Sequence, residues 1–171
     1  MTKTPLVVDT CIISHALNQN KKAAYAAYFK TLESKFKFIV TGYTQYELTC
    51  SSDKENRIKI LEYIENDMSY VELSETLMNN AARVFYLYSK HSSTIGKKIS
   101  AGDIINASVA IALNCPLLTI DNNDYPRPFF QDDDRGRVTY NTNKNKETTD
   151  TVYILKPDML NIKQCFEDHK V

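Results

Sequence analysis

The sequence predicts an α/β protein, in which helices cover both faces of a central, mainly parallel β-sheet. The main observation is that short apolar runs alternate with longer segments whose apolar residues recur at helical spacing. A second is size, because 171 residues with 43% hydrophobic content suit one globular domain spanning 1–171. A third is that no apolar run approaches a bilayer span or a signal peptide, so we expect a cytoplasmic protein without a membrane partner.

The predicted strands are short apolar runs, several of them rich in Val and Ile. They begin with "PLVV" and "FKFIVT", continue with "SYVELS" and "PLLTI", and end with "TVYILK". By number these strands cover 5–8, 36–41, 69–74, 116–120 and 151–156.

The predicted helices fill the intervals between these strands, at 10–18, 21–35, 44–51, 53–66, 75–91 and 100–114. The segment 21–35 carries aromatic residues at the three-and-four spacing of an amphipathic helix, and 75–91 has apolar residues along one face. Apolar residues surround the segment 100–114 almost completely, so that helix is expected to be buried. A last helix is predicted to begin near Pro157.

The segment after the fourth strand interrupts this alternation. It is polar, contains prolines and is long for a connection within a compact domain. We expect a polar loop insertion at about 126–150, either a functional flap or a mobile segment, with "RVTYN" as a candidate for a small hairpin.

Acidic residues follow several different elements of the predicted sheet. Asp9 follows the first strand, Glu47 lies in the helix after the second, and Asp103 opens the buried helix. Asp121 ends the fourth strand, with Asp124 three residues later. Open α/β sheets bind ligands at the carboxyl ends of their parallel strands, so we expect these acids to share one crevice.

Carboxylates placed this close together disfavour one another's ionised form. A hard divalent cation relieves the repulsion, and oxygen ligands without nearby thiolate or imidazole suit Mg²⁺ or Mn²⁺. Such an ion stabilises the charge that develops in phosphoryl displacement. The chemistry that this arrangement suggests is phosphodiester hydrolysis.

Each acid also has a purely structural interpretation. Ser100 and Asp103 fit a capping box, as do Thr44 and Glu47. Asp9 fits a turn or cap, and Asp124 fits a solvated Asx turn. Capping does not explain why acids recur at one sheet edge after different elements, so the joint pattern favours a site.

Four segments resemble a known family. In chain order, "VVDTCIIS", "TGYTQYEL", "SAGDIINASVAIA" and "LLTIDNNDYPR" look like the four acidic motifs of PIN-domain nucleases, most closely the VapC-type toxins of bacterial toxin–antitoxin pairs. "YILKPDML" is similar to the closing segment of that family. The resemblance implies a three-layer α/β/α domain with about five strands, in the order 3-2-1-4-5.

The resemblance also implies an activity, partners and roles for residues. It implies an endoribonuclease that depends on Mg²⁺ or Mn²⁺, acts on RNA such as tRNA or rRNA, is held by a cognate antitoxin and commonly forms a homodimer. The acids carried over as catalytic are Asp9, Glu47, Asp103 and Asp121. The metal ligands are Asp9, Asp103, Asp121 and Asp124, with Asp121 ranked before Asp124 as the fourth acid. Thr10, Asn106 and Thr119 are expected to support them, and Asn106 is a candidate partner of Asp103.

Nucleic-acid binding must be local, because 21 basic residues balance 21 acidic ones. The candidate phosphate contacts are Lys97, Lys98, Arg127, Arg135 and Arg137, and the candidates for base stacking are Tyr125, Phe129 and Phe130. A dimer interface is expected from the tyrosine-rich helices at 21–35 and 75–91 or, alternatively, these helices only pack in the core.

Other functions remain open at this point. Within the same family, the alternatives are a nuclease of RNA maturation or of DNA without an antitoxin, and an inactive RNA-binding or partner-binding module. A dinucleotide-binding enzyme is disfavoured because no G-x-G-x-x-G follows the first strand. A phosphatase with an aspartyl nucleophile would need an acid two residues after Asp9, where the chain has Cys11.

Overall fold

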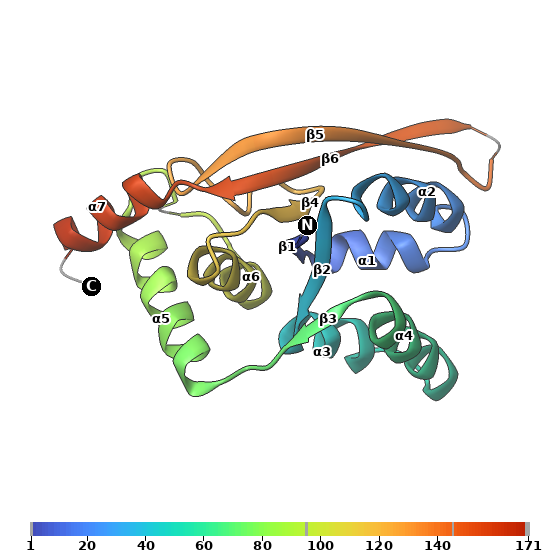
Figure 1. The fold of residues 1–171 in the computed structure, drawn as a ribbon, viewed down its shortest axis with the longest axis horizontal. Coiled ribbons are helices and arrows are strands. Elements are labelled where there is room, and N and C mark those ends of the chain that lie inside the picture. The colour runs from blue at the N-terminus through green and yellow to red at the C-terminus, as the bar shows by residue number, and fades with distance from the viewer. Residues whose placement is uncertain (1, 95, 145, 170–171) are drawn as a thin grey trace.

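The computed structural model describes residues 2–94, 96–144 and 146–169. Within these residues, six strands form one sheet in the order β3-β2-β1-β4-β6-β5 (Figure 1). The strands are β1 (Thr4–Val8), β2 (Phe36–Thr41), β3 (Ser69–Val71), β4 (Leu117–Thr119), β5 (Phe130–Asn141) and β6 (Glu147–Pro157). The helices are α1 (Thr10–Leu17), α2 (Lys22–Leu32), α3 (Gly42–Cys50), α4 (Lys54–Asp67), α5 (Glu75–Lys90), α6 (Ala101–Ala112) and α7 (Met159–His169).

The sheet is mixed: β3, β2, β1 and β4 are parallel, and β6 and β5 form an antiparallel extension at one edge. β1 lies at the centre and pairs in parallel with β2 and β4, while β3 pairs in parallel with β2. β6 is antiparallel to both β4 and β5. The α/β prediction is confirmed, and the five predicted strands lie in the expected order 3-2-1-4-5, with 151–156 of β6 as the fifth. The sheet has six strands rather than about five, because β5 adds one at the edge.

The expected loop insertion at 126–150 is also wrong, because most of it belongs to the long hairpin of β5 and β6 (Figure 1). The hairpin escapes a search for apolar runs because large parts of both strands face solvent. Val138 and Val152 are among the few hairpin residues that join the core. Gly136 lets the hairpin lie close to α2, since a Cβ there would come within 2.5 Å of the Tyr28 ring.

Two apolar layers cover the sheet, one on each face. In β1, Leu6 and Val8 belong to the layer formed with α1 to α4, and Val7 belongs to the layer formed with α5, α6 and α7. This alternation is the period-two pattern of a strand buried on both faces. The central strands are therefore fixed in register, and their carboxyl ends are held at one edge.

None of the helices in the described residues is long and apolar enough to cross a membrane.

Polar residues at the strand ends begin the helices that return to the sheet. Asp9 is the N-cap of α1, and its side chain accepts a hydrogen bond from the Thr10 amide. Thr41 caps α3 by accepting from the Thr44 amide, so this helix begins at Gly42 and the expected capping box of Thr44 is wrong. Thr41 takes that role because it is the last residue of β2 and already has extended backbone, as an N-cap requires.

One half-buried carboxylate fastens the hairpin to the first two helices. Asp150 on β6 accepts hydrogen bonds from Tyr25 at 2.8 Å, Lys21 at 3.1 Å and Tyr140 at 3.0 Å. The His15 ring lies 2.9 Å from the same carboxylate. These hydrogen bonds hold the pKa of Asp150 below its usual range against the opposing effect of burial.

We expect Asp150→Asn to lower the free energy of unfolding by about 2 kcal/mol, the range for hydrogen bonds to a charged group. The asparagine side chain cannot form the ion pair with Lys21, and its NH₂ group would face neighbouring groups that are themselves hydrogen-bond donors. Urea denaturation at pH 7 measures the change. Asp133→Asn, which alters an exposed acid of the same hairpin, is the control, and equal effects of the two variants would contradict this account.

Candidate active site

Asp9 is the most buried of the expected site acids, with only 5% of its surface exposed at the end of the central strand. Its Oδ1 atom accepts hydrogen bonds from the Thr10 amide at 2.7 Å and the Asn106 side-chain amide at 3.2 Å. Its Oδ2 atom accepts from the Thr119 hydroxyl at 2.7 Å and the Cys11 thiol at 3.2 Å. Neutral donors from α1, α6 and β4 therefore hold this carboxylate.

Asn106 connects Asp9 to the neighbouring strand. Its side-chain oxygen accepts hydrogen bonds from the hydroxyls of Thr41 at 3.1 Å and Thr44 at 3.3 Å. This pairing orients the amide so that its NH₂ group faces Asp9. The expected partner of Asn106 was Asp103, and the structure gives Asp9 instead, because the Asp103 side chain bonds back to the start of its own helix.

Glu47 lies on α3, which carries none of the other expected site acids. The Thr10 hydroxyl donates to its Oε2 atom at 2.7 Å. Gly102 at the start of α6 makes room for it, because a Cβ at that position would stand 2.8 Å from the same oxygen. The sequence motifs did not indicate the role of Gly102, since its importance depends on the approach of a distant side chain.

Asp103 combines the capping role and a place in the acid cluster. Its Oδ2 atom accepts from the Ser100 amide at 3.0 Å, and its own amide donates to the Ser100 hydroxyl at 3.1 Å, which completes the predicted capping box. Burial raises the pKa of Asp103, and the charges of Asp9 and Glu47 raise it further. The capping interpretation is therefore confirmed, and the role of Asp103 in a metal site stays a prediction.

The last two acids occupy different positions in the loop after β4. Asp124 is partly buried, and burial together with the charges of Asp103, Asp121 and Asp9 raises its pKa to about 6. Asp121 is exposed, and its Oδ1 atom accepts the Asn123 amide at 3.2 Å in an Asx turn. The charges of both Asp9 and Asp103 thus act on Asp124.

Cys11 was not among the expected site residues. Its thiol contacts Asp9 and lies 3.5 Å from the Thr119 hydroxyl. Burial, together with the charge of Asp9, raises the pKa of the thiol to about 12. The group therefore stays protonated and acts as a weak donor to Asp9.

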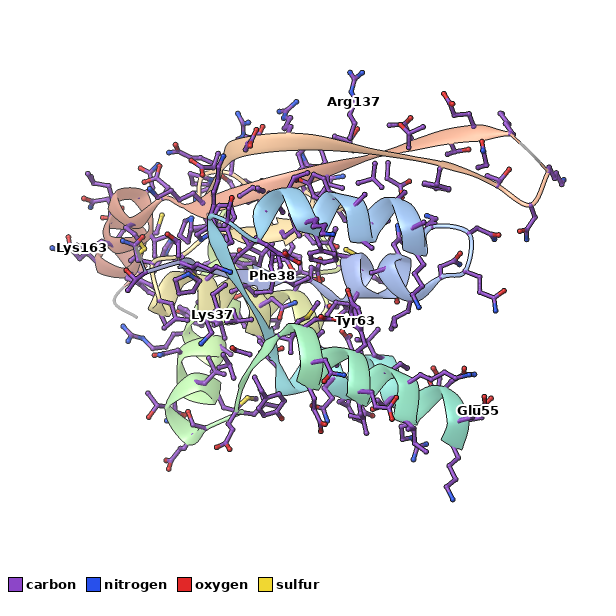
Figure 2. All side chains as sticks on the ribbon, turned by 45° about the vertical axis from the view of Figure 1, so that its right-hand side comes forward. Lys37, Phe38, Glu55, Tyr63, Arg137 and Lys163 are labelled. Carbon is purple, nitrogen blue, oxygen red and sulfur yellow. The ribbon has the colours of Figure 1, made fainter. Side chains whose placement is uncertain are left out.

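The expected basic residues differ in how far they are free to contact a ligand. Lys97 and Lys98 are exposed just before α6, and Lys97 lowers the pKa of Asp124. Arg127 pairs with Asp132 at 3.0 Å, and Arg135 pairs with the same carboxylate. Arg137 projects from the outer side of the hairpin, away from the helices (Figure 2).

The aromatic residues that were expected to stack bases are instead buried. Tyr125, Phe129 and Phe130 have at most 2% of their surface exposed. Tyr125 packs edge-on against Phe130, and Phe129 stacks on Tyr88 of α5. The expectation was wrong because these residues carry the chain from the polar turn back into the core.

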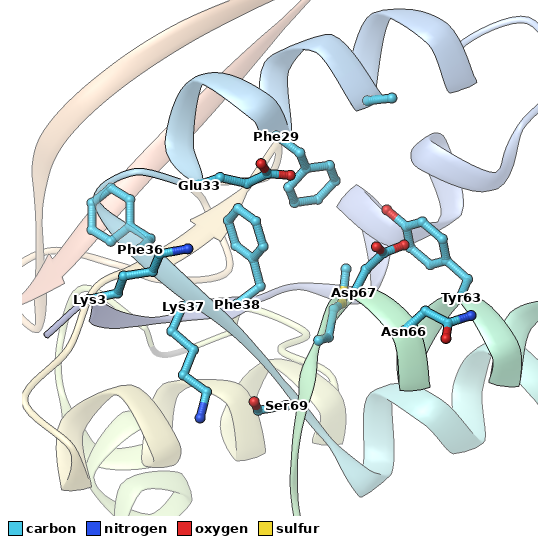
Figure 3. Close-up of a pocket in the computed structure, with 12 residues that line it drawn as sticks. Lys3, Phe29, Glu33, Phe36, Lys37, Phe38, Tyr63, Asn66, Asp67 and Ser69 are labelled. Carbon is cyan, nitrogen blue, oxygen red and sulfur yellow. The ribbon is translucent and has the colours of Figure 1, made fainter.

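One hollow is lined by a predicted site acid, a second by the chain neighbours of Asp124, and a third lies elsewhere on the sheet. A cleft of about 730 Å³ between α1, α3 and α4 includes Thr10 and Glu47. A smaller cavity of about 260 Å³ beyond Asp124 is lined in part by Lys97 and Arg127. A third, of about 450 Å³, lies at the amino ends of β2 and β3 beside Phe38 and contains no expected site residue (Figure 3).

Comparisons with known proteins agree with this arrangement. The family model of the PIN domain matches residues 6–128. Among solved structures, the chain is similar to VapBC2 from Rickettsia felis, crystallised with a DNA fragment from the promoter, at 20% identity and a TM-score of 0.59. That match covers 72% of this chain and 93% of the other. A comparison with curated protein sequences gives no match.

Acids from separate elements lie near the carboxyl end of the central strand in this mostly parallel α/β sheet. The chain belongs to the PIN domain family, whose model matches most of its length. PIN domains are in general metal-dependent nucleases, and the four predicted acidic motifs lie within or at the borders of the matched segment.

The donor set fits a hard divalent cation. The acids that influence one another offer only oxygen atoms, and the cysteine beside them stays protonated. In the described part of the chain, no three His, Cys, Asp or Glu side chains already form a group that could hold one ion. Mg²⁺ is usually bound through one or two carboxylates and keeps several waters, so such a group is not required.

The raised pKa of Asp124 predicts a pH-dependent change in stability. Its contribution to stability is complete below the unfolded pKa of about 3.9 and is lost as the pH rises through about 6. We therefore expect Asp124→Asn to have a higher melting temperature than the unsubstituted protein at pH 7.5 in EDTA, and a similar one at pH 4. Thermal unfolding followed by circular dichroism measures both, with Asp133→Asn as control. The same difference at the two pH values would show that ionisation of Asp124 is not the cause.

Proposed function

We propose that this protein is an endoribonuclease dependent on Mg²⁺ or Mn²⁺, and that it is the toxin of a type II toxin–antitoxin pair. The observation that carries the proposal is the mutual influence of acids from separate elements around Asp9 at the carboxyl edge of the sheet. The PIN domain match supports nuclease chemistry. The VapC-like motifs, together with the likeness to the VapBC2 complex, favour the toxin among the nucleases of this family.

The proposed roles follow from the geometry of each acid. Asp9, Asp103 and Asp124 would hold the cation, with Asp124 placed before Asp121 because the charges of Asp9 and Asp103 act on it. When bound, the ion supplies Lewis-acid stabilisation of the negative charge on the phosphoryl oxygens. Glu47, held by the Thr10 hydroxyl at the mouth of the cleft, is placed to orient the attacking water or accept its proton.

The substrate would reach the acids along the hollows on either side of them. Glu47 lines the first cleft, and Asn123 and Tyr125, the chain neighbours of Asp124, line the second cavity, so a polymeric substrate would contact both. Lys97 and Arg127 in the second cavity would contact backbone phosphates, with Lys98 close by. Arg135 and Arg137 on the hairpin would serve RNA that extends further.

Two protein partners belong to this proposal. A cognate antitoxin in the cytoplasm would hold the toxin inactive. A second copy would pair through α5, whose outer face exposes Met78, Phe85 and Tyr86. The other helix expected at an interface, α2, buries Tyr25 and Phe29 in the core instead.

The purified protein should cleave RNA at discrete internal positions when Mn²⁺ or Mg²⁺ is present and should stop when EDTA is added. Asp103→Asn should reduce the rate roughly 100-fold or more, the range for losing a group that acts directly in catalysis. Glu55→Gln, at an exposed position of α4 (Figure 2), is the control and should cleave normally. Gel analysis of end-labelled RNA measures all three. Asp103→Asn protein that folds and cleaves at the normal rate would contradict the proposal.

Gly102→Ala should separate activity from stability. The added Cβ would displace the Glu47 carboxylate, which can move because it is the end of a flexible side chain. Alanine favours the helix over glycine by up to about 1 kcal/mol, so the melting temperature should not fall. We expect the cleavage rate to drop by roughly tenfold or more, within the range for a displaced general base. Unchanged cleavage with intact folding would remove Glu47 from the mechanism.

A further inference from the structure

A buried hydroxyl beside the acids has no partner. Tyr125 follows Asp124 directly and is 2% exposed, and among the described residues nothing accepts or donates a hydrogen bond at its phenolic oxygen. An unsatisfied buried hydroxyl costs about 1–3 kcal/mol. Buried polar groups in folded proteins are nearly always satisfied, so this one requires an explanation.

The phenol is close to the centre of the acid cluster. The charges of Asp9 and Asp103 add to burial in raising the pKa of Tyr125, and the Asn106 side chain acts in the opposite direction. Tyr125 therefore lies near the amide that holds Asp9, although no contact between them has the geometry of a hydrogen bond. The edge-on contact with Phe130, at 5.6 Å between ring centroids, fixes the ring in place.

The two nearby acids differ in what they can still accept. Asp9 already accepts four hydrogen bonds, two on each oxygen. Asp103 accepts one on Oδ2 from Ser100, and within the described residues its Oδ1 atom accepts none. The phenol thus has a donor to offer, and Asp103 has an acceptor to receive it.

We propose that Tyr125 is a positioning residue, whose O–H donates to the free carboxylate oxygen of Asp103 when a divalent cation occupies the site. The inference rests on the proposed function, because the cation supplies the reason for Asp103 to turn inward. The Asp103 carboxylate uses Oδ2 to accept from the Ser100 amide, so Oδ1 is the oxygen that the phenol would reach. With the ion bound, this hydrogen bond fixes the Asp103 ligand and satisfies a buried group in the same step.

A second tyrosine provides a matched comparison. Tyr88 on α5 is 3% exposed, and its phenolic oxygen is also without a partner among the described residues. The charge of Asp103 influences its pKa, but Asp9 has no such influence. Removing either hydroxyl relieves a similar burial cost, but of these two tyrosines only Tyr125 has a pKa that the charges of both acids raise.

The test measures Mn²⁺ binding by titration calorimetry on the full chain, together with melting temperature in EDTA. We expect Tyr125→Phe to weaken Mn²⁺ binding roughly tenfold, as loss of a hydrogen bond to a charged acceptor predicts, without lowering the melting temperature in EDTA. Tyr88→Phe should bind Mn²⁺ as the unsubstituted protein does. In the Asp103→Asn background, Tyr125→Phe should cause no further loss, because the acceptor is already altered.

The possible results separate this inference from the proposed function. Mn²⁺ binding by Tyr125→Phe within twofold of the unsubstituted protein overturns the inference, as does an equal loss in Tyr88→Phe. A lower melting temperature of Tyr125→Phe in EDTA also overturns it, since the hydroxyl would then be bonded without the ion. Failure of the proposed function is a different result, in which the unsubstituted protein and Asp103→Asn show the same Mn²⁺ titration.

Discussion

The structure depends on how one buried carboxylate is held. Asp9 stands at the end of the central strand, where an unpaired charge would destabilise the fold by several kcal/mol. Its four hydrogen bonds come from the start of α1, from α6 and from β4, so each of these elements must arrive within about 3 Å of the same group. A backbone hydrogen bond also ties Asp9 to β4, because the Asp9 amide donates to the Leu118 carbonyl at 3.0 Å. The requirement to satisfy Asp9 therefore positions the elements around it as well as the acid itself.

The same requirement reaches the other acids through a second layer of hydrogen bonds. The Asn106 amide can face Asp9 because the hydroxyls of Thr41 and Thr44 occupy its oxygen. These threonines belong to the end of β2 and the start of α3, the helix that carries Glu47. Glu47 in turn accepts from Thr10, the residue next to Asp9. A closed chain of hydrogen bonds thus links α3, α6 and α1, so a shift of one element would displace the acids that these bonds position.

Local signals in the sequence predicted most of this framework, and tertiary contacts decided the rest. The apolar run before Asp9 and the capping box at Ser100 are local patterns, and both are present in the structure. The strand at 151–156 and a candidate hairpin at "RVTYN" were predicted, but the full length of the hairpin was not, because its buried positions, such as Val138, are few on a mostly solvated ribbon. Likewise, the spacing of Asp121 and Asp124 does not show which side chain turns inward, since an Asx turn formed in three dimensions decides it. Cys11 and Gly102 gain their roles only from neighbours that are distant in the chain.

The most informative property of the site is that the hydrogen-bonding capacity of Asp9 is used by neutral donors while its charge is not balanced by a cationic side chain in the described residues. All four donors to Asp9 are neutral, namely a backbone amide, a side-chain amide, a hydroxyl and a protonated thiol. A lysine or arginine in any of these positions would have stabilised the carboxylate more strongly, and it would also have cancelled the field that attracts a cation. Of the groups that set the pKa of Asp124, Lys97 is the one that opposes the increase, and it lies on an exposed segment. Neutral donors thus let the fold keep a buried acid without a resident positive charge, and this leaves the negative potential of the cluster available to an ion from solution.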